Sequence, residues 1–128
     1  MVIKSPQTIV AEALSEVKTI SSDEALKLHN ENQCTLIDIR DETELQKIGR
    51  IENSHNISRG LLEFLIHPES EFVNSNKIDL NKEIVLFCAA GGRSALAAKS
   101  LKEMGFDKVS HVEGGFGTMQ NSGFKVIK

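Results

Sequence analysis

Short apolar runs alternate with amphipathic stretches along most of this chain. The runs predict short strands at residues 35–39, 55–57, 84–87 and 109–112. The run at 84–87 is uniformly apolar, which is typical of a strand buried on both faces. Apolar residues at helical spacing predict helices at 8–17, 42–48, 61–66, 95–104 and 116–121. Short strands that alternate with helices predict an α/β fold, with a parallel sheet flanked by helices on both faces.

Capping and helix-breaking residues mark the ends of several predicted helices. Ser21 and Glu24 fit a capping box, in which a hydroxyl and a carboxylate bind free backbone N–H groups, so a further helix begins there. Gly49 and Gly105 end two helices, and Pro68 follows a third. The stretch 69–81 is mostly polar, and we expect it to be a surface connection.

Length and composition fit one small domain. The chain has 128 residues, of which 40% are hydrophobic and 26% are charged, an ordinary globular mixture. We place an N-terminal helical extension at 1–18 and the domain itself at 19–128. The net charge is −3 and the Lys and Arg residues are scattered, so we expect no nucleic-acid partner. No apolar run is long enough to cross a bilayer, and we expect a cytoplasmic protein without a membrane partner.

Cysteine and histidine usage argues against a disulfide and against a metal site. The two cysteines, Cys34 and Cys88, fall at the ends of different predicted elements. Cys34 lies just ahead of an apolar run, and we interpret it as a packed small residue rather than a resolving thiol. The four histidines stand apart, without the paired spacing of a metal site, so we predict no metal and no other cofactor.

The most informative segment follows the apolar run at 84–87, where Cys88 enters a short loop. Small residues let successive backbone N–H groups turn inward around the sulfur, and the positive end of the following helix points to the same place. Such a pocket binds anions and favours the nucleophilic thiolate. We therefore predict that Cys88 is a catalytic nucleophile rather than a structural cysteine in a tight turn. The predicted anion-binding loop consists of Ala89, Ala90, Gly91, Gly92, Arg93 and Ser94.

Four segments, in order, resemble the rhodanese (sulfurtransferase) superfamily. Besides the Cys88 loop they are LIDIRDETEL at 36–45, GRIENSHNISRG at 49–60, and VEGGF at 112–116 with GF at 123–124. The resemblance runs from about Thr19 to Val126. It implies a rhodanese-like fold for the predicted domain 19–128.

Several positions depart from the family pattern outside the cysteine loop. We expect these departures to alter local packing more than activity, because changed turn chemistry is tolerated in connections and Met can replace a large apolar side chain. They are Arg50 in place of His, Glu52 and Asn53 in place of Pro and Gly, Ser58 in place of Pro, and Met119 in place of Trp.

The resemblance implies a sulfurtransferase of the thiosulfate (rhodanese) type. Cys88 attacks the outer sulfur of a donor such as thiosulfate, becomes a persulfide, and passes the sulfur to a thiophilic acceptor such as cyanide or a thiol. The loop amides hold the persulfide or the incoming anion. Ser94 either binds the thiolate or caps the following helix, and we expect the cap. The implied partners are a small-molecule sulfur donor and a thiophilic acceptor, with a protein or other thiol as a further candidate acceptor.

Charged residues near the loop and at a predicted strand end are candidates for supporting roles. Arg93 either faces the substrate anion or folds back onto an acid such as Asp38 or Glu44, and we favour this brace because a rigid loop needs support. Asp38 and Arg40 either orient the site or form a plain ion pair at a strand end. Arg59 either attracts anions at the rim of the site or stays solvated.

Two alternatives come from other functional classes. A phosphatase or arsenate reductase also places a cysteine in an anion-binding loop closed by an arginine, but such loops resemble Cys-x5-Arg. Here four residues separate Cys88 from Arg93, and the tighter ring suits a sulfur atom. The other alternative is a non-catalytic rhodanese-like interaction module, and the presence of Cys88 argues against it.

Overall fold

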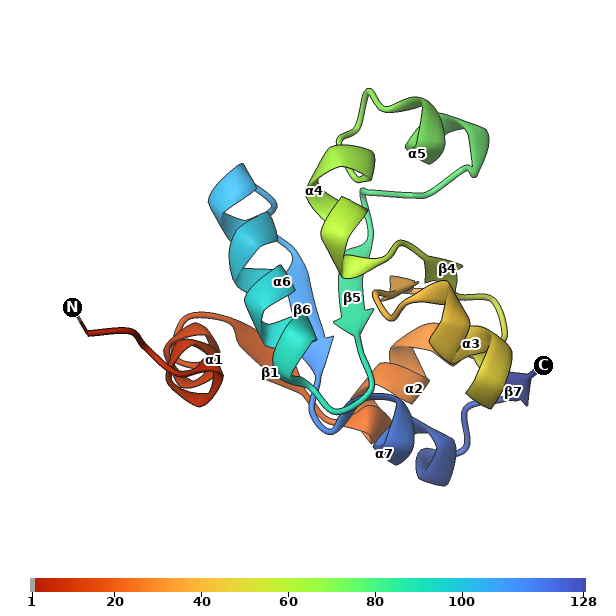
Figure 1. The fold of residues 1–128 in the computed structure, drawn as a ribbon. Helices are drawn as coiled ribbons and strands as arrows, with labels where there is room; N and C mark the ends of the chain where they lie inside the picture. Colours follow the sequence, from red (N-terminus) through yellow and green to blue (C-terminus); the bar gives the residue numbers. More distant parts are fainter. Residues whose placement is uncertain (1) are drawn as a thin grey trace.

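A parallel sheet of five strands forms the centre of the structure, a computed structural model that describes residues 2–128. The strand order is β1-β6-β5-β2-β4, and every neighbouring pair is parallel. The predicted α/β fold, with a parallel sheet flanked by helices, is confirmed (Figure 1). The five strands are β1 (Lys18–Ile20), β2 (Cys34–Asp38), β4 (His55–Asn56), β5 (Glu83–Phe87) and β6 (Val109–Val112).

Strand β5 shows how the sheet divides the core into two halves. Ile84 and Leu86 pack in one apolar cluster with the helices at 62–65, 71–75 and 92–104, whereas Val85 and Phe87 pack in the other with the helices at 22–30 and 115–122. All four side chains are at most 1% exposed, and burying each one contributes roughly 1.5–3 kcal/mol. The strand is therefore buried on both faces, as its apolar run predicts. The helices are α1 (Pro6–Leu14), α2 (Ser22–Asn30), α3 (Glu42–Ile48), α4 (Leu62–Leu65), α5 (Glu71–Ser75), α6 (Gly92–Met104) and α7 (Gly115–Ser122).

The N-terminal region differs from the sequence prediction. The predicted helix 8–17 is the shorter helix α1, which begins after Ser5, whose hydroxyl accepts a hydrogen bond from the Thr8 amide. It packs beside α6 (Figure 1), with Ala13 fully buried. The chain then joins the sheet as β1, which the sequence did not indicate because only Ile20 of its three residues is buried. Met1, the first residue of the predicted extension 1–18, lies outside the described residues, and the boundary itself stays a prediction.

The stretch 69–81 is more ordered than the predicted surface connection. It contains α5, whose first turn is capped by Ser70, and it buries Val73 and Ile78 in the core. Most of the stretch is exposed, as a surface connection predicts, but the prediction missed α5 and the two buried side chains, of which Val73 lies in α5 and Ile78 follows it. A second, antiparallel pair was also missed: β3 (Arg50–Ile51) and β7 (Val126–Ile127) join residues far apart in the sequence.

The other predicted elements agree closely with the structure. Helix α3 has the predicted bounds, and Ser21 caps α2 by accepting a hydrogen bond from the Glu24 amide. The predicted helix 61–66 is split into a 3₁₀ turn (Arg59–Leu61) and α4. Among residues 2–128, no helix combines the length and apolar character that crossing a membrane requires.

A close backbone approach joins α7 to the end of β5. Gly115 has a φ of +60°, and a Cβ there would lie 2.8 Å from the Ala89 carbonyl carbon, as well as against the Cys88 oxygen. The next amide, of Phe116, donates a 2.8 Å hydrogen bond to the Cys88 carbonyl. Only glycine fits both the left-handed backbone and this contact.

The approach predicts that Gly115→Ala destabilises the fold. A non-glycine residue at positive φ costs about 1–3 kcal/mol, and the backbone clash adds to this, so we expect a loss of about 2–4 kcal/mol. Denaturant unfolding measures it. The matched control is Gly117→Ala in the same helix, where a Cβ meets nothing within 4 Å; it should be neutral or stabilising by up to about 1 kcal/mol. Equal unfolding free energies for the two variants would contradict the account.

Candidate active site

Cys88 lies at the carboxyl end of the sheet, directly after β5. Parallel strands bring their carboxyl ends to one edge, where open α/β sheets bind ligands. The chain leaves β5 at Phe87 and begins α6 at Gly92, so only a few residues make the turn. Gly91 precedes the helix in the left-handed conformation, with a φ of 112°. This position aims the amino-terminal end of α6 at the sulfur.

The sulfur of Cys88 is buried and surrounded by donors from the loop. The Gly91 amide donates to Sγ at 3.1 Å and the Ser94 amide donates at 3.4 Å. The Ser94 hydroxyl oxygen lies 3.6 Å from Sγ, and Cys88 as a whole is 1% exposed. Ala89 and Ala90 are exposed, whereas Gly92 is half-buried. Two N–H groups and the positive end of a helix stabilise negative charge on this sulfur.

Ser94 has a different position from the one we predicted. The residue that caps α6 is Gly91, and Ser94 is the third residue inside the helix. The cap prediction is therefore wrong, because the helix begins three residues earlier than a cap at Ser94 requires. The Ser94 side chain is buried instead, and its hydroxyl lies within hydrogen-bond distance of the Gly91 carbonyl at 3.1 Å and of His111 at 2.9 Å.

The Arg93 side chain is held by Glu44 of α3. Its guanidinium donates two hydrogen bonds to the Glu44 carboxylate, at 2.8 and 3.0 Å. Glu44 also accepts from the Asp41 amide at 3.0 Å, as part of the capping box that opens α3. A planar fork that binds both carboxylate oxygens fixes orientation as well as distance. The pair therefore ties the first turn of α6 to the first turn of α3.

The ion pair shifts the titration of both partners. The hydrogen bonds from Arg93 hold the pKa of Glu44 at about 2, well below its ordinary value of 4.5. In turn, the hydrogen bonds to Glu44 raise the pKa of Arg93, with a further contribution from the nearby Cys88. Both groups are thus charged across the physiological range.

Asp38 and Arg40 form a buried ion pair beside the site. Arg40 donates to both Asp38 oxygens, at 2.7 to 3.2 Å, and the two residues are at most 1% exposed. The same guanidinium donates to the Gly49 carbonyl at 2.9 Å and lies 4.0 Å above the ring of Phe116. Removing one partner of a buried pair leaves an uncompensated charge. The pair links the ends of β2 and α3 to α7, and Asp38 is not the acid that holds Arg93.

The structure does not bring the Arg59 side chain to the cysteine loop. Arg59 donates to both oxygens of Glu63 on the next helical turn, at 2.9 and 3.0 Å, and its side chain is 31% exposed. Glu63 in turn accepts a hydrogen bond from Ser100 of α6. This pair braces the 3₁₀ turn and α4 against α6.

Sequence reasoning missed two residues of the site, His111 and Thr19. His111, from β6, is 1% exposed, and its Nδ1 lies 2.9 Å from the Ser94 oxygen. Its other nitrogen, Nε2, lies 2.9 Å from the hydroxyl oxygen of Thr19 on β1. The sequence did carry one signal, since a polar pair, Ser110 and His111, interrupts the otherwise apolar predicted strand 109–112. The partners could not be found because they lie 17 and 92 residues away.

Cys34 lies at the opposite end of the sheet from Cys88. It pairs with Glu83 at the start of β5, so about five residues, or on the order of 16 Å along the strand, separate the backbone positions of the two cysteines. Cys34 is 6% exposed within the core, and burial raises its pKa to about 11. Its predicted place as a packed small residue is confirmed. Both cysteines are free.

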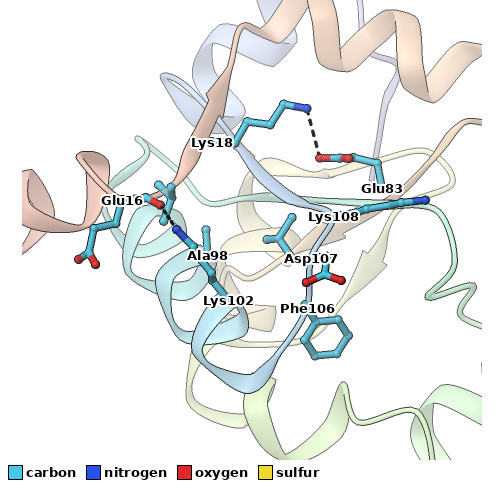
Figure 2. A pocket seen from close by; sticks show the side chains of 10 residues that line it. Glu16, Lys18, Glu83, Ala98, Lys102, Phe106, Asp107 and Lys108 are labelled. Carbon is cyan, nitrogen blue, oxygen red and sulfur yellow. Dashed lines mark hydrogen bonds and ion pairs between the residues drawn. The ribbon is translucent and has the colours of Figure 1, made fainter.

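A cavity of about 510 Å³ also opens at this opposite end of the sheet (Figure 2). Two lysines of its lining are engaged: Lys18 lies 3.7 Å from Glu83, and Lys102 donates to the backbone carbonyl of Glu16 at 2.8 Å. The lining includes no cysteine or histidine, and Cys88 lies at the other end of the sheet. Among residues 2–128, no group of three or more His, Cys, Asp or Glu side chains is arranged to hold a metal ion.

The Arg93–Glu44 pair predicts a pH dependence of stability. A depressed folded-state pKa stabilises the fold above the unfolded value, 4.5, and this stabilisation is lost as the pH falls toward about 2. Glu44→Gln keeps the capping hydrogen bond but has no charge, so its unfolding free energy should fall less across this window than that of the parent. Glu42→Gln, an exposed carboxylate in the same helical turn, is the matched control. Equal acid sensitivity of the parent and Glu44→Gln, measured by denaturant unfolding, would argue against the pair.

Several known proteins are similar to this chain in sequence, and two solved structures are similar to it in fold as well. A protein of unknown function from Rhodopseudomonas palustris, described as a possible tyrosine phosphatase, is 34% identical, with a TM-score of 0.85 over 99% of this chain and 97% of that one. The polysulfide-sulfur transferase of Wolinella succinogenes, a homodimer, is also 34% identical, with a TM-score of 0.74 over 94% and 85%. A tRNA uridine(34) hydroxylase from Enterobacter sp. is 29% identical over 88% of this chain.

The curated relatives are longer than this chain. The chain spans 34% of the length of the tRNA hydroxylase and 59% of the length of another relative.

The family model of the rhodanese-like domain matches residues 21–122, which include Cys88, its loop and the strands on either side. The chain therefore belongs to the rhodanese-like domain family.

Proposed function

We propose that this chain is a sulfurtransferase that carries a sulfane sulfur on Cys88. The observation that carries the proposal is the pair of loop amides that donate to Cys88 Sγ at 3.1 and 3.4 Å, at the amino-terminal end of α6. These donors stabilise a thiolate before attack and a persulfide anion after it. Membership of the rhodanese-like family and the likeness to a polysulfide-sulfur transferase support the same chemistry.

The proposed reaction has two displacement steps. With thiosulfate as donor, the Cys88 thiolate attacks the outer sulfur, the sulfur–sulfur bond of the donor breaks, and sulfite leaves with the electron pair. The product is a Cys88 persulfide anion. A thiophilic acceptor such as cyanide or a thiol then attacks the outer sulfur of the persulfide, and the thiolate of Cys88 is the leaving group. With cyanide the second product is thiocyanate, and no external oxidant or reductant is needed.

In this proposal Arg93 acts mainly as a brace for the loop. Two of its three donor nitrogens, Nη1 and Nη2, are engaged with Glu44, at 2.8 and 3.0 Å, so the guanidinium contributes its charge to the site rather than a direct contact with the sulfur. The partners we propose are a small-molecule sulfur donor and a thiophilic acceptor, which includes a thiol on a protein. We keep the expectation that nucleic acids and membranes are not partners, and that the protein is cytoplasmic.

A cysteine phosphatase is the second candidate, because the Rhodopseudomonas palustris protein carries that description as a possibility. Four residues lie between Cys88 and Arg93, one fewer than in loops of the Cys-x5-Arg kind. In addition, Arg93 is held by Glu44, whereas a phosphatase needs its arginine on the substrate oxyanion. Both features favour sulfur transfer.

The proposal predicts that thiosulfate adds one sulfur to Cys88. Intact mass spectrometry should show the added mass, and peptide mapping should place it on Cys88. Cys88→Ser should abolish both the adduct and turnover of thiosulfate with cyanide, because a serine cannot form a persulfide. Cys34→Ala is the matched control and should keep most of the activity, since Cys34 is buried at the other end of the sheet.

The same preparations separate the competing functions. Hydrolysis of an aryl phosphate without any sulfur transfer would identify a phosphatase instead. A folded parent chain that neither loads sulfur nor hydrolyses phosphate would point to an interaction module.

A further inference from the structure

A chain of hydrogen-bonding groups leads from the buried sulfur to the surface of the sheet. Cys88 Sγ lies 3.6 Å from the Ser94 oxygen, which lies 2.9 Å from Nδ1 of His111. Nε2 of His111 lies 2.9 Å from the Thr19 oxygen. Cys88, Ser94 and His111 are at most 1% exposed, whereas Thr19 is exposed on the edge strand β1. The chain thus crosses from α6 through β6 to the solvent side of β1.

We propose that Ser94, His111 and Thr19 form a relay that carries the proton of Cys88 to the surface and then holds the thiolate. This inference rests on the proposed function, in which Cys88 must lose a proton to become the nucleophile. Ser94 contacts the sulfur directly. His111 and Thr19 act through Ser94 and are positioning residues.

The relay has two complete hydrogen-bond patterns, one for each state of the sulfur. In the thiol state, the S–H group donates to Ser94, the Ser94 hydroxyl donates to Nδ1 of His111, and Nε2–H donates to Thr19. In the thiolate state every bond is reversed. Ser94 donates to the sulfur, Nδ1–H donates to Ser94, and Thr19 donates to Nε2.

Proton movement between the two patterns is balanced. The thiol proton moves to the Ser94 oxygen while the Ser94 proton moves to Nδ1. The Nε2 proton moves to the Thr19 oxygen, and the original Thr19 proton passes to water. One proton leaves the sulfur and one enters the solvent, while the imidazole is neutral in both patterns and no buried polar atom of the relay loses its partner.

The surroundings favour this neutral exchange over a charged imidazolium. Burial lowers the pKa of His111, and the opposing effect of Glu113, beyond the end of β6, is smaller. From α6, the charge of Arg93 acts on Cys88 only through space, because its guanidinium is paired with Glu44 of α3. On β1, the neighbouring Lys18 is exposed and pairs with Glu83. A His111 that stored the proton would be an uncompensated buried charge, so passing the proton on costs less.

Titration of the thiolate by its ultraviolet absorbance tests the relay without any sulfur donor. The chain has no Tyr and no Trp, so no phenolate or indole signal overlaps with that of the thiolate. The background is Cys34→Ala, and the Cys88→Ser protein gives the baseline. The variants are Ser94→Ala, His111→Asn, the two combined, and Thr19→Val, with circular dichroism to confirm that each is folded.

We expect the substitutions to shift the titration midpoint of Cys88 to higher pH. We also expect the shifts caused by Ser94→Ala and His111→Asn not to add. Ser94→Ala should raise the midpoint by about one unit, a tenfold loss of thiolate, because it removes a hydrogen bond to a charged group. His111→Asn and Thr19→Val should raise it by smaller amounts. Since His111 acts through Ser94, the double variant should shift no further than Ser94→Ala alone.

Two results would overturn the relay. Additive shifts in the double variant would show that His111 acts independently of Ser94, as a merely structural residue does. An unchanged midpoint in Thr19→Val, an exposed position where the substitution preserves shape, would show that Thr19 does not help to hold the thiolate, as the relay requires. The matched control is His55→Asn, a half-buried histidine on β4 that β5 and β2 separate from β6, and its midpoint should equal that of the parent. Because the titration uses no sulfur donor, it tests the relay separately from sulfur transfer. A relay without sulfur transfer would show the predicted shifts of the midpoint but no turnover of thiosulfate.

Discussion

The contact between Gly115 and the backbone of Cys88 and Ala89 is the constraint on which the site depends. It allows the amide of Phe116 to bind the Cys88 carbonyl at 2.8 Å, which fixes the point where the chain leaves β5. The ring of Phe116 then lies beneath the guanidinium of Arg40, whose charge is satisfied by the buried Asp38. One glycine without a side chain thus brings the ends of β2, β5 and α7 together around the cysteine.

Backbone groups, rather than cationic side chains, surround the sulfur. The cation nearest in sequence, Arg93, is turned onto Glu44, and the donors to Sγ are the amides of Gly91 and Ser94. Amides fixed at a helix start need no reorganisation when charge develops, and they have no net charge that could hold a product too tightly. The ion pair then holds the loop, while the buried serine and histidine connect the sulfur to the sheet behind it.

The sequence predicted the elements that a local pattern of residues marks. It did not predict the elements whose formation depends on contacts with residues far away in the chain. The apolar run before Cys88 and the Gly-Gly step at 114–115 made the loop and closing motif recognisable. Strand β1 was missed because its pairing with β6 depends on residues about 90 positions away, and α5 because Val73 alone in it is buried. Ser94 was misassigned because the left-handed turn of Gly91 moved the helix start, which no residue pattern reveals.

A crystal structure of the protein after treatment with thiosulfate tests the central claim most directly. The account predicts one additional sulfur bonded to Cys88 Sγ, within hydrogen-bond distance of loop amides between Ala89 and Ser94, with Arg93 still paired to Glu44. An unmodified cysteine with an intact oxyanion bound by a released Arg93 would contradict it, because the loop would then hold its ligand through the arginine side chain instead of receiving sulfur through the thiolate.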